Sequence, residues 1–397
     1  MDFLNLKPEA FGLDISDLSL KIIKLKKKRG ISSLASFGEA EIKPGIIKGG
    51  EIKDEEKLAQ IIREAIKKVR GEKLKTRYVV VSLPEEKAFL QVIQMPKVPE
   101  EDLRSAVIYE AENYIPTPIE EVYLDYQIVP PVYDHLDHLD VLIAALPKKT
   151  VEPYLSALKL AGLQPKVLEI ESLAIARALI KDGITTQPIL LIDLGATRTS
   201  FIIFSGKSLK FTTSIPVSST NFSEIISKNL GVTLAEAERL KIKHGLEEKI
   251  KIKIEYEETK IERERGKIFE ALIPALIDLI QQIKRYLNYY QTHAFHEHLP
   301  PTIFQENNSN KHKPQKVVGG LPPDGKGISK ILLCGGGANL KGLCQLLSLE
   351  LKIPVEIGNP WINILSEGKK EVTELSFEES LKYTTALGLA LRGIKEK

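Results

Sequence analysis

One stretch of this sequence decides the fold: Leu190-Leu-Ile-Asp193-Leu-Gly195-Ala196-Thr197-Arg-Thr199-Ser200-Phe201. It is an apolar strand that ends in an aspartate, followed by a short polar turn and a second apolar strand. The same arrangement occurs earlier, in Phe11-Gly-Leu-Asp14-Ile-Ser16-Asp17-Leu-Ser19-Leu-Lys21. A third apolar strand opens into three consecutive glycines, in Ile331-Leu-Leu-Cys-Gly335-Gly336-Gly337-Ala-Asn339-Leu340. Two hairpins led by aspartate and a later glycine-rich turn predict a duplicated α/β fold that closes around a nucleotide.

These segments contain the groups that a bound nucleotide requires. Backbone N–H groups converge at turns and helix N-termini, where they bind phosphate, and glycine lets the chain come close. Asp14 and Asp193 are suited to hold Mg²⁺ through its water shell, and the glycines at 335–337 leave room for a ribose or a base. Each motif alone has a simpler explanation, because Asp-Leu-Gly is common in hairpin turns and glycine runs are common in tight loops. The order of all three favours the nucleotide interpretation.

The composition excludes several classes of protein. A length of 397 residues predicts two domains or more, and a net charge of +3 with 27% charged residues gives no reason to expect a nucleic-acid partner. The basic run Lys24–Arg29 is interpreted as a solvated turn. Two cysteines without a Cys-x-x-Cys pair indicate a reducing compartment. Because the sequence shows neither a secretory signal nor an apolar run of ~20 residues, we expect a cytosolic protein.

The periodicity of apolar residues predicts alternating strands and helices. Strands are expected at about 11–25, 33–41, 78–82, 88–94, 123–129, 141–146, 189–204, 249–256 and 354–357. Helices are expected at 55–69, 100–114, 149–161, 170–180, 221–230, 234–244, 266–292, 340–351 and 381–392. Pro274 either kinks the seventh of these helices or delays its start. Residues 85–165 have the pattern of a small inserted α+β domain, and Pro-Pro, Asn-Asn and Gly-Gly pairs predict a long exposed loop at 296–327.

Two histidine-containing segments and one cysteine have simple explanations. The segment 133–140 is interpreted as an acidic hairpin tip rather than a metal site. His296-Glu-His298 lacks the spacing of a zinc protease, although His293 lies nearby. Cys334 is expected in the core rather than as a nucleophile.

Taken together, the motifs resemble the actin-like ATPase superfamily and, within it, the family of type IV pilus assembly proteins PilM, which is related to the division protein FtsA. The two hairpins resemble the two phosphate loops, and 334–340 resembles the adenosine motif. Leu234-Ala-Glu-Ala-Glu238-Arg-Leu-Lys241 resembles the helix that contacts the ribose and base, while 169–176 and 383–391 resemble the two connecting helices. Ala386 and Gly388 are expected to allow those helices to approach closely. The segments 95–104, 110–116, 144–149 and 283–290 resemble the pilus branch in particular.

The resemblance implies a site for ATP and Mg²⁺. It implies that Glu171 is the catalytic residue that positions a water, and that Asp14 and Asp193 are at the metal. The implied nucleotide-binding residues are Asp14, Ser16, Asp17, Ser19, Lys21, Asp193, Gly195, Ala196, Thr197, Thr199, Glu238, Lys241, Gly335, Gly336, Gly337, Asn339 and Leu340.

The resemblance also implies four subdomains and a partner. Subdomain 1A would comprise 1–84, 166–187 and 380–397, 1C would be 85–165, 2A would comprise 188–220 and 328–379, and 2B would be 221–295, with the flexible loop at 296–327. Subdomain 1C and its neighbour would form a groove for the N-terminal cytoplasmic peptide of a PilN-like single-pass membrane protein. The chain would then be a cytoplasmic scaffold that reaches the membrane only through this partner and contacts pilus motor components. Nucleotide would act as a switch that changes the groove or a surface for self-association. Tyr109, Tyr114 and Tyr123 would either contact the peptide or pack in a core.

The first phosphate loop departs from the family pattern. Ser16 replaces a glycine, Asp17 adds a carboxylate, and Leu18 replaces a small residue. A Cβ at position 16 restricts the turn, and a carboxylate repels a triphosphate unless a metal intervenes. Asp17 in a left-handed conformation would preserve the hairpin with a shifted register. We therefore expect nucleotide binding with weak or absent hydrolysis.

Two alternative functions follow from the same superfamily. An FtsA-like division filament protein would be expected to end in an amphipathic membrane helix, which the segment after the last helix, 392–397, does not contain. A small-molecule kinase would need a substrate base in the cleft, for which no motif is evident.

Overall fold

The computed structural model describes residues 9–28, 31–130, 138–246, 260–293, 327–365 and 374–395. The strands are β1 (Phe11–Ile15), β2 (Ser19–Lys28), β3 (Ile31–Glu41), β4 (Ile47–Lys48), β5 (Glu51–Ile52), β6 (Arg70–Gly71), β7 (Tyr78–Leu83), β8 (Phe89–Pro96), β9 (Val122–Val129), β10 (His138–Pro147), β11 (Gln164–Ile170), β12 (Thr185–Leu194), β13 (Thr199–Gly206), β14 (Ser208–Ile215), β15 (Lys330–Cys334) and β16 (Val355–Ile357). The α-helices are α1 (Glu55–Lys67), α2 (Glu100–Ala111), α3 (Lys148–Leu160), α4 (Glu171–Leu179), α5 (Ser219–Leu230), α6 (Leu234–His244), α7 (Lys260–His293), α8 (Leu343–Leu351), α9 (Phe377–Ser380) and α10 (Thr384–Lys395). The short 3₁₀ helices are η1 (Glu85–Lys87), η2 (Ile119–Glu121), η3 (Lys181–Gly183), η4 (Gly336–Asn339) and η5 (Leu381–Tyr383).

Two large sheets repeat one strand order, as the duplicated hairpins predict. The first has the order β11-β7-β1-β2-β3-β6, and the second has the order β14-β13-β12-β15-β16. In each sheet three consecutive strands are antiparallel, and the first of the three also pairs in parallel with a later strand, β7 beside β1 and β15 beside β12. In each sheet the first of these strands, β1 or β12, therefore ends near its aspartate, Asp14 or Asp193. This end faces the corresponding turn of the other sheet.

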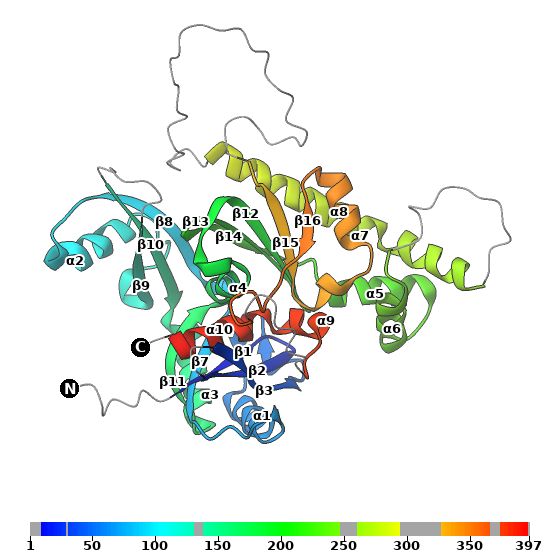
Figure 1. Cartoon of the computed structure of the whole chain (residues 1–397), viewed down its shortest axis with the longest axis horizontal. Coiled ribbons are helices and arrows are strands. Elements are labelled where there is room, and N and C mark those ends of the chain that lie inside the picture. The colour runs from blue at the N-terminus through cyan, green and yellow to red at the C-terminus, as the bar shows by residue number, and fades with distance from the viewer. Residues whose placement is uncertain are drawn as a thin grey trace, which may run out of the picture.

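Two helices pack against each other between the sheets. Helix α4 follows β11, and helix α10 follows β16 and η5, so they are equivalent elements of the two halves (Figure 1). Their contact is close because Gly388 has no side chain: a Cβ there would lie 1.9 Å from the carbonyl oxygen of Ala174. Helix α10 also rests on β1, where a Cβ at Gly12 would lie 2.4 Å from the carbonyl oxygen of Ala386. The expectation that Gly388 permits close approach of the two helices is confirmed, and that for Ala386 stays a prediction.

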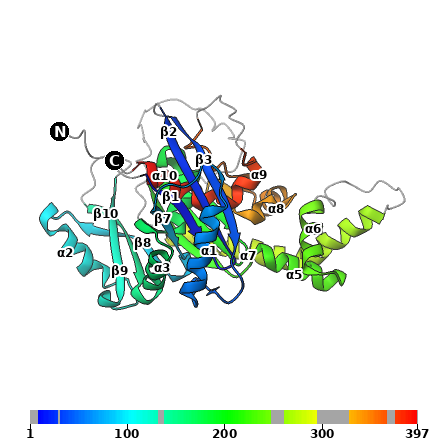
Figure 2. The ribbon, with the colours of Figure 1, turned by 90° about the horizontal axis from the view of Figure 1, so that it is seen from below.

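The outer face of the first sheet is covered by α1 and α3 (Figure 2). Helix α1 begins at an Asp54 cap, whose side chain accepts a hydrogen bond from the Lys57 N–H, and it buries Leu58, Ile62 and Ala65. Helix α3 contributes Val151, Tyr154, Ala157 and Leu158 to the same core. The chain between β7 and α3 forms a separate three-stranded sheet, β8-β10-β9, that packs against α2 over its own core.

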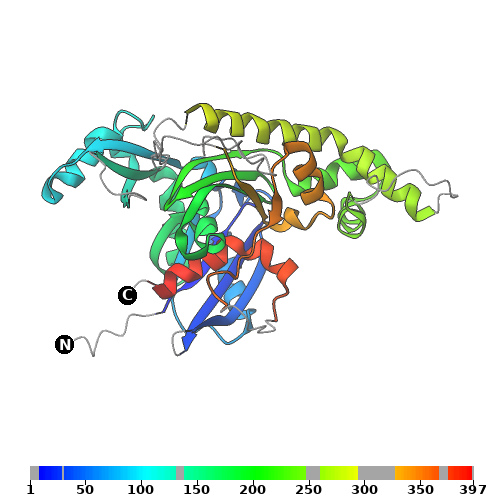
Figure 3. The same ribbon diagram turned by 45° about the horizontal axis from the view of Figure 1, so that its top comes forward.

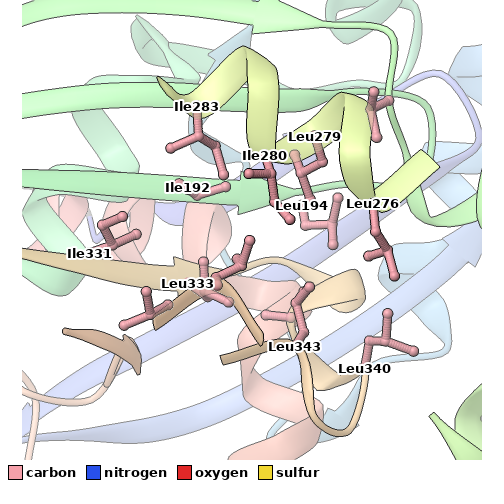
Figure 4. Packing of buried hydrophobic residues seen from close by; sticks show 14 of the residues in the cluster. Ile192, Leu194, Leu276, Leu279, Ile280, Ile283, Ile331, Leu333, Leu340 and Leu343 are labelled. Atoms are coloured by element: carbon pink, nitrogen blue, oxygen red, sulfur yellow. The ribbon is translucent and has the colours of Figure 1, made fainter. Parts of the chain in front are cut away.

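The second sheet is covered on its outer face by the long helix α7 (Figure 3). Leu276, Leu279, Ile280 and Ile283 of this helix point toward Ile192, Leu194, Ile331 and Leu333 of the sheet (Figure 4). Helix α7 continues through Pro274, which is exposed, so the expected delay of its start is wrong.

Most predicted elements are confirmed within one to three residues, and the differences have identifiable causes. Strand β11 occupies residues that were left between two helices, and β14 follows the second hairpin as an edge strand that was not predicted. The final helix is interrupted by η5, and α8 starts at Leu343 because η4 comes first. The predicted strand at 249–256 and nearly all of the predicted loop at 296–327 lie outside the described residues. Within the described residues, no helix combines the length and apolar character that crossing a membrane requires.

Candidate functional site

The first strands of both sheets and the strand β15 end at one cavity of about 250 Å³. Asp14 is the next-to-last residue of β1, Asp193 is the next-to-last residue of β12, and Gly335 directly follows β15. Helix α4 begins at the same place with Glu171. The cavity therefore brings together both predicted phosphate loops, the predicted glycine turn and the predicted catalytic residue.

The two hairpins close with the same hydrogen bond. The Ser16 N–H donates to the Ser19 carbonyl at 2.9 Å, and the Gly195 N–H donates to the Arg198 carbonyl at 2.9 Å. Ser16 thus takes the place of Gly195 without a positive φ, and Asp17 is not left-handed either. The serine hydroxyl also donates to the Ser19 carbonyl at 2.9 Å. A serine at position 16 is compatible with this turn, and the expected left-handed shift at Asp17 is wrong.

The floor of the cavity is acidic. Asp14 is buried and accepts a hydrogen bond from the Ser82 hydroxyl at 2.9 Å, while Lys21 Nζ lies 4.0 Å from its other oxygen. Burial and the charge of Asp14 raise the pKa of Asp193 to about 6. Burial, followed by the charges of Asp14 and Asp193, raises the pKa of Glu171 well above its ordinary value. Buried carboxylates that raise one another's pKa require a cation when an anion binds.

The glycine turn is shaped by the aspartate beneath it. Gly335 has a φ of +80°, and a Cβ there would lie 2.2 Å from Asp193 Oδ1. A Cβ at Gly337 would lie 2.5 Å from Leu194 Cγ. Only glycine therefore allows η4 to approach the end of β12 so closely.

A second cavity of about 390 Å³ adjoins the first and shares Ser219, Glu238, Gly336, Gly337 and Lys382 with it. It is lined in addition by Lys241, Asn339 and Leu340. In α6, Lys241 Nζ lies 2.7 Å from Glu238 Oε2, one helical turn away, and also donates to the Ser219 carbonyl at 2.7 Å. Burial lowers the pKa of Lys241. The two cavities form one continuous cleft, with the phosphate loops at one end and α6 at the other.

The predicted residues fall into this cleft with one exception. The first cavity is lined by Asp14, Ser16, Asp17, Ser19, Lys21, Glu171, Asp193, Gly195, Ala196, Thr197, Glu238, Gly335, Gly336 and Gly337, and the second adds Lys241, Asn339 and Leu340. Thr199 does not line it. Its side chain is buried, and its hydroxyl donates to the Val217 carbonyl at 2.7 Å.

Sequence reasoning missed the ion pairs that cross the cleft. Arg198, in the second hairpin turn, pairs with Asp17 of the first turn at 3.4 Å and with Glu86 of η1. The Asp17 carboxylate also accepts the N–H groups of Gly49 and Gly50, both at 2.9 Å. The extra carboxylate of the first loop is therefore neutralised by Arg198. Arg198 was present in the quoted motif, but its partners are distant in sequence and no local pattern indicates them.

A third cavity, of about 670 Å³, lies outside the cleft and is here called the β8–β14 groove. It is lined by Ala88 to Gln94, Tyr114, Asp140, Lys210, Phe211, Thr212, Tyr289 and Tyr290. Both β8 and β14 are edge strands of their sheets. Tyr109, Tyr114 and Tyr123 are exposed, so the core alternative for them is wrong, and of the three only Tyr114 is among the residues that line this groove.

The remaining candidate positions have structural roles. No group of three or more His, Cys, Asp or Glu side chains within the described ranges is arranged to hold a metal ion. His138 pairs with Asp140 at 3.5 Å, whereas 133–137, His296 and His298 lie outside the described residues. Cys334 is buried as expected, and burial raises the pKa of its thiol well above its ordinary value.

The duplicated sheets, the paired connecting helices and the cleft between two phosphate loops define an actin-like protein. Comparisons with solved structures agree on this fold: ethanolamine utilization protein EutJ from Carboxydothermus hydrogenoformans matches with a TM-score of 0.52 at 15% identity, covering 97% of this chain and 89% of that chain. MreB5 of Spiroplasma citri bound to AMPPNP matches with a TM-score of 0.50 at 14% identity, covering 98% of both chains.

Within this class, the chain belongs to the family of type IV pilus assembly proteins PilM, whose model matches residues 12–302 and 322–394. A solved PilM–PilN type IV pilus biogenesis complex contains a chain that is 27% identical, with a TM-score of 0.74, covering 98% of this chain and 99% of that one. Cell division protein FtsA from Buchnera aphidicola is 25% identical over 250 residues. That match covers 61% of this chain and about half of the FtsA sequence, 52%.

Proposed function

We propose that this chain is a scaffold of the type IV pilus machinery on the cytoplasmic side of the inner membrane. In this proposal the β8–β14 groove holds the N-terminal cytoplasmic peptide of a PilN-like single-pass membrane protein, and the cleft binds ATP with Mg²⁺ as a switch. The membrane is reached through that partner, and pilus motor components are further partners. The four subdomains expected from the sequence would be the parts that move.

The proposal that a peptide binds in the groove rests on its two edge strands, β8 and β14. Strand β8 pairs with β10 on one side only, and β14 pairs with β13 on one side only. An extended peptide adds readily to such an edge, because its backbone completes the hydrogen-bonding ladder while its side chains enter pockets. Aromatic side chains from Tyr114 and Tyr289 line the groove and offer amphipathic contact surface. A relative of this family was solved in complex with PilN.

The nucleotide half of the proposal is supported by the chemistry of the cleft. Lys21, Arg198 and the turn N–H groups suit phosphate, and carboxylates outnumber cations among the lining residues. Because those carboxylates would repel a triphosphate, the donor set fits a nucleotide that arrives with Mg²⁺, which Asp14 and Asp193 would hold through water. When bound, Mg²⁺ would offset the charge of the phosphates. Glu171 would orient a water, and its raised pKa favours slow or absent turnover.

Fluorescence anisotropy with a labelled N-terminal peptide of the organism's own PilN-like protein tests this function. We expect saturable binding at micromolar concentration or tighter, which a scrambled peptide does not show. Tyr114→Ala should weaken binding by about tenfold if the ring is a principal contact. Tyr109→Ala is the matched control, because Tyr109 is 70% exposed and does not line the groove.

Two outcomes would contradict the proposal. A peptide that does not bind with or without Mg-ATP would exclude the groove as its site. Calorimetry that shows neither heat nor thermal stabilisation up to millimolar Mg-ATP would exclude the switch.

A further inference from the structure

The short helix η1 lies on the chain between the cleft and the β8–β14 groove. It is separated from β7 by Pro84 alone and from β8 by Ala88 alone. On one side of it, Pro84 and Glu86 line the first cavity of the cleft. On the other side, the groove lining begins at Ala88. Only Lys87 therefore lies between Glu86, which lines the cleft, and Ala88, which lines the groove.

Two adjacent carboxylates of η1 hold different parts of the second half of the molecule. Glu86 pairs with Arg198, in the turn between β12 and β13. Strand β14 packs against η1, and its Thr212, which lines the groove, lies beside the Glu85 carboxylate. The two contacts link η1 to the turn before β13, beside the phosphate loops, and to the wall of the groove. They lie toward the same end of the β13–β14 hairpin, where Thr199 pairs with Ile215 and Ile202 with Thr212.

Glu85 also contacts the beginning of α4. Its carboxylate accepts the Ser172 N–H at 3.3 Å, and its own N–H donates to Glu171 Oε2 at 3.4 Å. Glu171 lines the cleft. Glu85 is 4% exposed, so a rearrangement that removed one partner would leave a buried polar group without compensation. Glu85 thus contacts the start of α4 through its side chain and the Glu171 carboxylate through its backbone N–H, while β14 packs against the same short helix.

We propose that η1 couples the two sites, with Thr212 and Glu85 transmitting the state of the nucleotide cleft to the β8–β14 groove. The coupling rests on the proposed function, since it requires a nucleotide in the cleft. A change in the distance between the halves on nucleotide binding moves Arg198 relative to Glu86 and Thr212 relative to Glu85. Because only Ala88 separates β8 from η1, and β14 carries Thr212, both walls of the groove move with these contacts. Glu85 is a positioning residue in this scheme and touches no ligand.

Hydrogen–deuterium exchange of the full chain, with and without saturating Mg-ATP, tests the coupling without needing the peptide. In the unmodified protein, nucleotide should change the exchange rates of residues 88–94 and 210–212 by about fivefold or more, the lower end of typical allosteric coupling. Thr212→Val removes the hydroxyl at nearly constant shape and should abolish the change at the groove while nucleotide still binds. Thr213→Val is the matched control: it is the neighbouring residue on the opposite face of β14, and it should behave like the unmodified protein. Glu85→Ala should act like Thr212→Val if it folds.

Each possible result of this experiment either supports or overturns the proposed coupling. Nucleotide that binds and changes the cleft but leaves the groove exchange unaltered would overturn the coupling and leave the proposed function standing. A response that persists in Thr212→Val would also overturn it. Failure of Mg-ATP to bind the unmodified protein would overturn the nucleotide switch and the coupling together. A groove response that is present in the unmodified protein and in Thr213→Val, and lost in Thr212→Val, would establish it.

Discussion

Asp193 is the residue on which most features of the cleft depend. It ends β12, lies beneath Gly335 and interacts with the Cys334 thiol at 3.8 Å. Burial and the nearby Asp14 charge raise its pKa to about 6, while Lys21 acts in the opposite direction. Because this carboxylate is costly to ionise in the nucleotide-free protein, binding of a cation beside it should stabilise its ionised form strongly.

This cost makes the stability of the free protein depend on pH. Below about pH 4, Asp193 is protonated in both the folded and the unfolded chain, so it does not lower the free energy of unfolding. Between pH 4 and 6 the unfolded chain releases the proton first, so the folded state loses stability as pH rises. At roughly 1.4 kcal/mol per pKa unit, the loss reaches about 3 kcal/mol above pH 7.

Asp193→Asn should therefore stabilise the nucleotide-free protein at pH 8 by up to about 3 kcal/mol and have no effect near pH 4. Urea unfolding at a series of pH values measures this. Asp125→Asn is the control, because Asp125 is exposed on β9. A pH-independent effect of Asp193→Asn would show that ionisation of this group is not the cause.

At the scale of elements, the packing of α4 on α10 joins the two halves at the base of the cleft. Each helix follows the last parallel strand of one half, and the two are separated by little more than backbone at Gly388. Such an interface transmits movement because it has almost no compressible side chain between its parts.

Gly388→Ala should destabilise the protein by about 1–3 kcal/mol, since its Cβ would lie 1.9 Å from the Ala174 carbonyl oxygen and the helices would have to separate. Chemical denaturation measures the loss. Gly336→Ala is the matched control, because its Cβ would meet only Lys382 Cβ at 3.7 Å. Equal stability of the two variants would contradict the close packing.

Elements that carry a strong local pattern were predictable from sequence, and elements defined by their neighbours were not. The apolar stripe of α1 and the aspartate-led hairpins are local signals. Strand β11 begins with Gln164-Pro165-Lys166 and is half exposed, so its composition does not indicate a strand. Its extended conformation is stabilised by pairing with β7, which is distant in sequence. The candidate site divides in the same way: its loops and glycines follow from local motifs, whereas the pairing of Arg198 with Glu86 depends on the closed arrangement of two halves.

In the molecule as a whole, a set of ion pairs and a packing contact link the halves across the cleft. Arg198 joins the second half to Asp17 and Glu86, and β14 packs against η1. The side chains of Arg198, Asp17 and Glu86 are 21%, 13% and 19% exposed, so these ion pairs are largely shielded from water. They join the two halves directly across the cleft.

Arg198→Ala should open the nucleotide-free molecule. Small-angle X-ray scattering should show a radius of gyration larger by roughly a few per cent than the unmodified value, which is about 21 Å or more for a chain of this length. Arg104→Ala, at an exposed position of α2, should leave it unchanged. An unaltered radius in Arg198→Ala would mean that these ion pairs do not hold the halves together.

The docking of α10 on the first sheet has a consequence for synthesis on the ribosome. Strand β1 ends at Ile15, whereas α10 begins at Thr384, and it is α10 that covers Ile23 and Leu25 of β2. At roughly 5–20 residues per second, tens of seconds separate translation of the sheet from translation of the helix that buries it. During that interval an apolar sheet face has no partner from its own chain. The nascent protein should therefore depend on a chaperone until α10 has been translated, and its two halves should complete folding together.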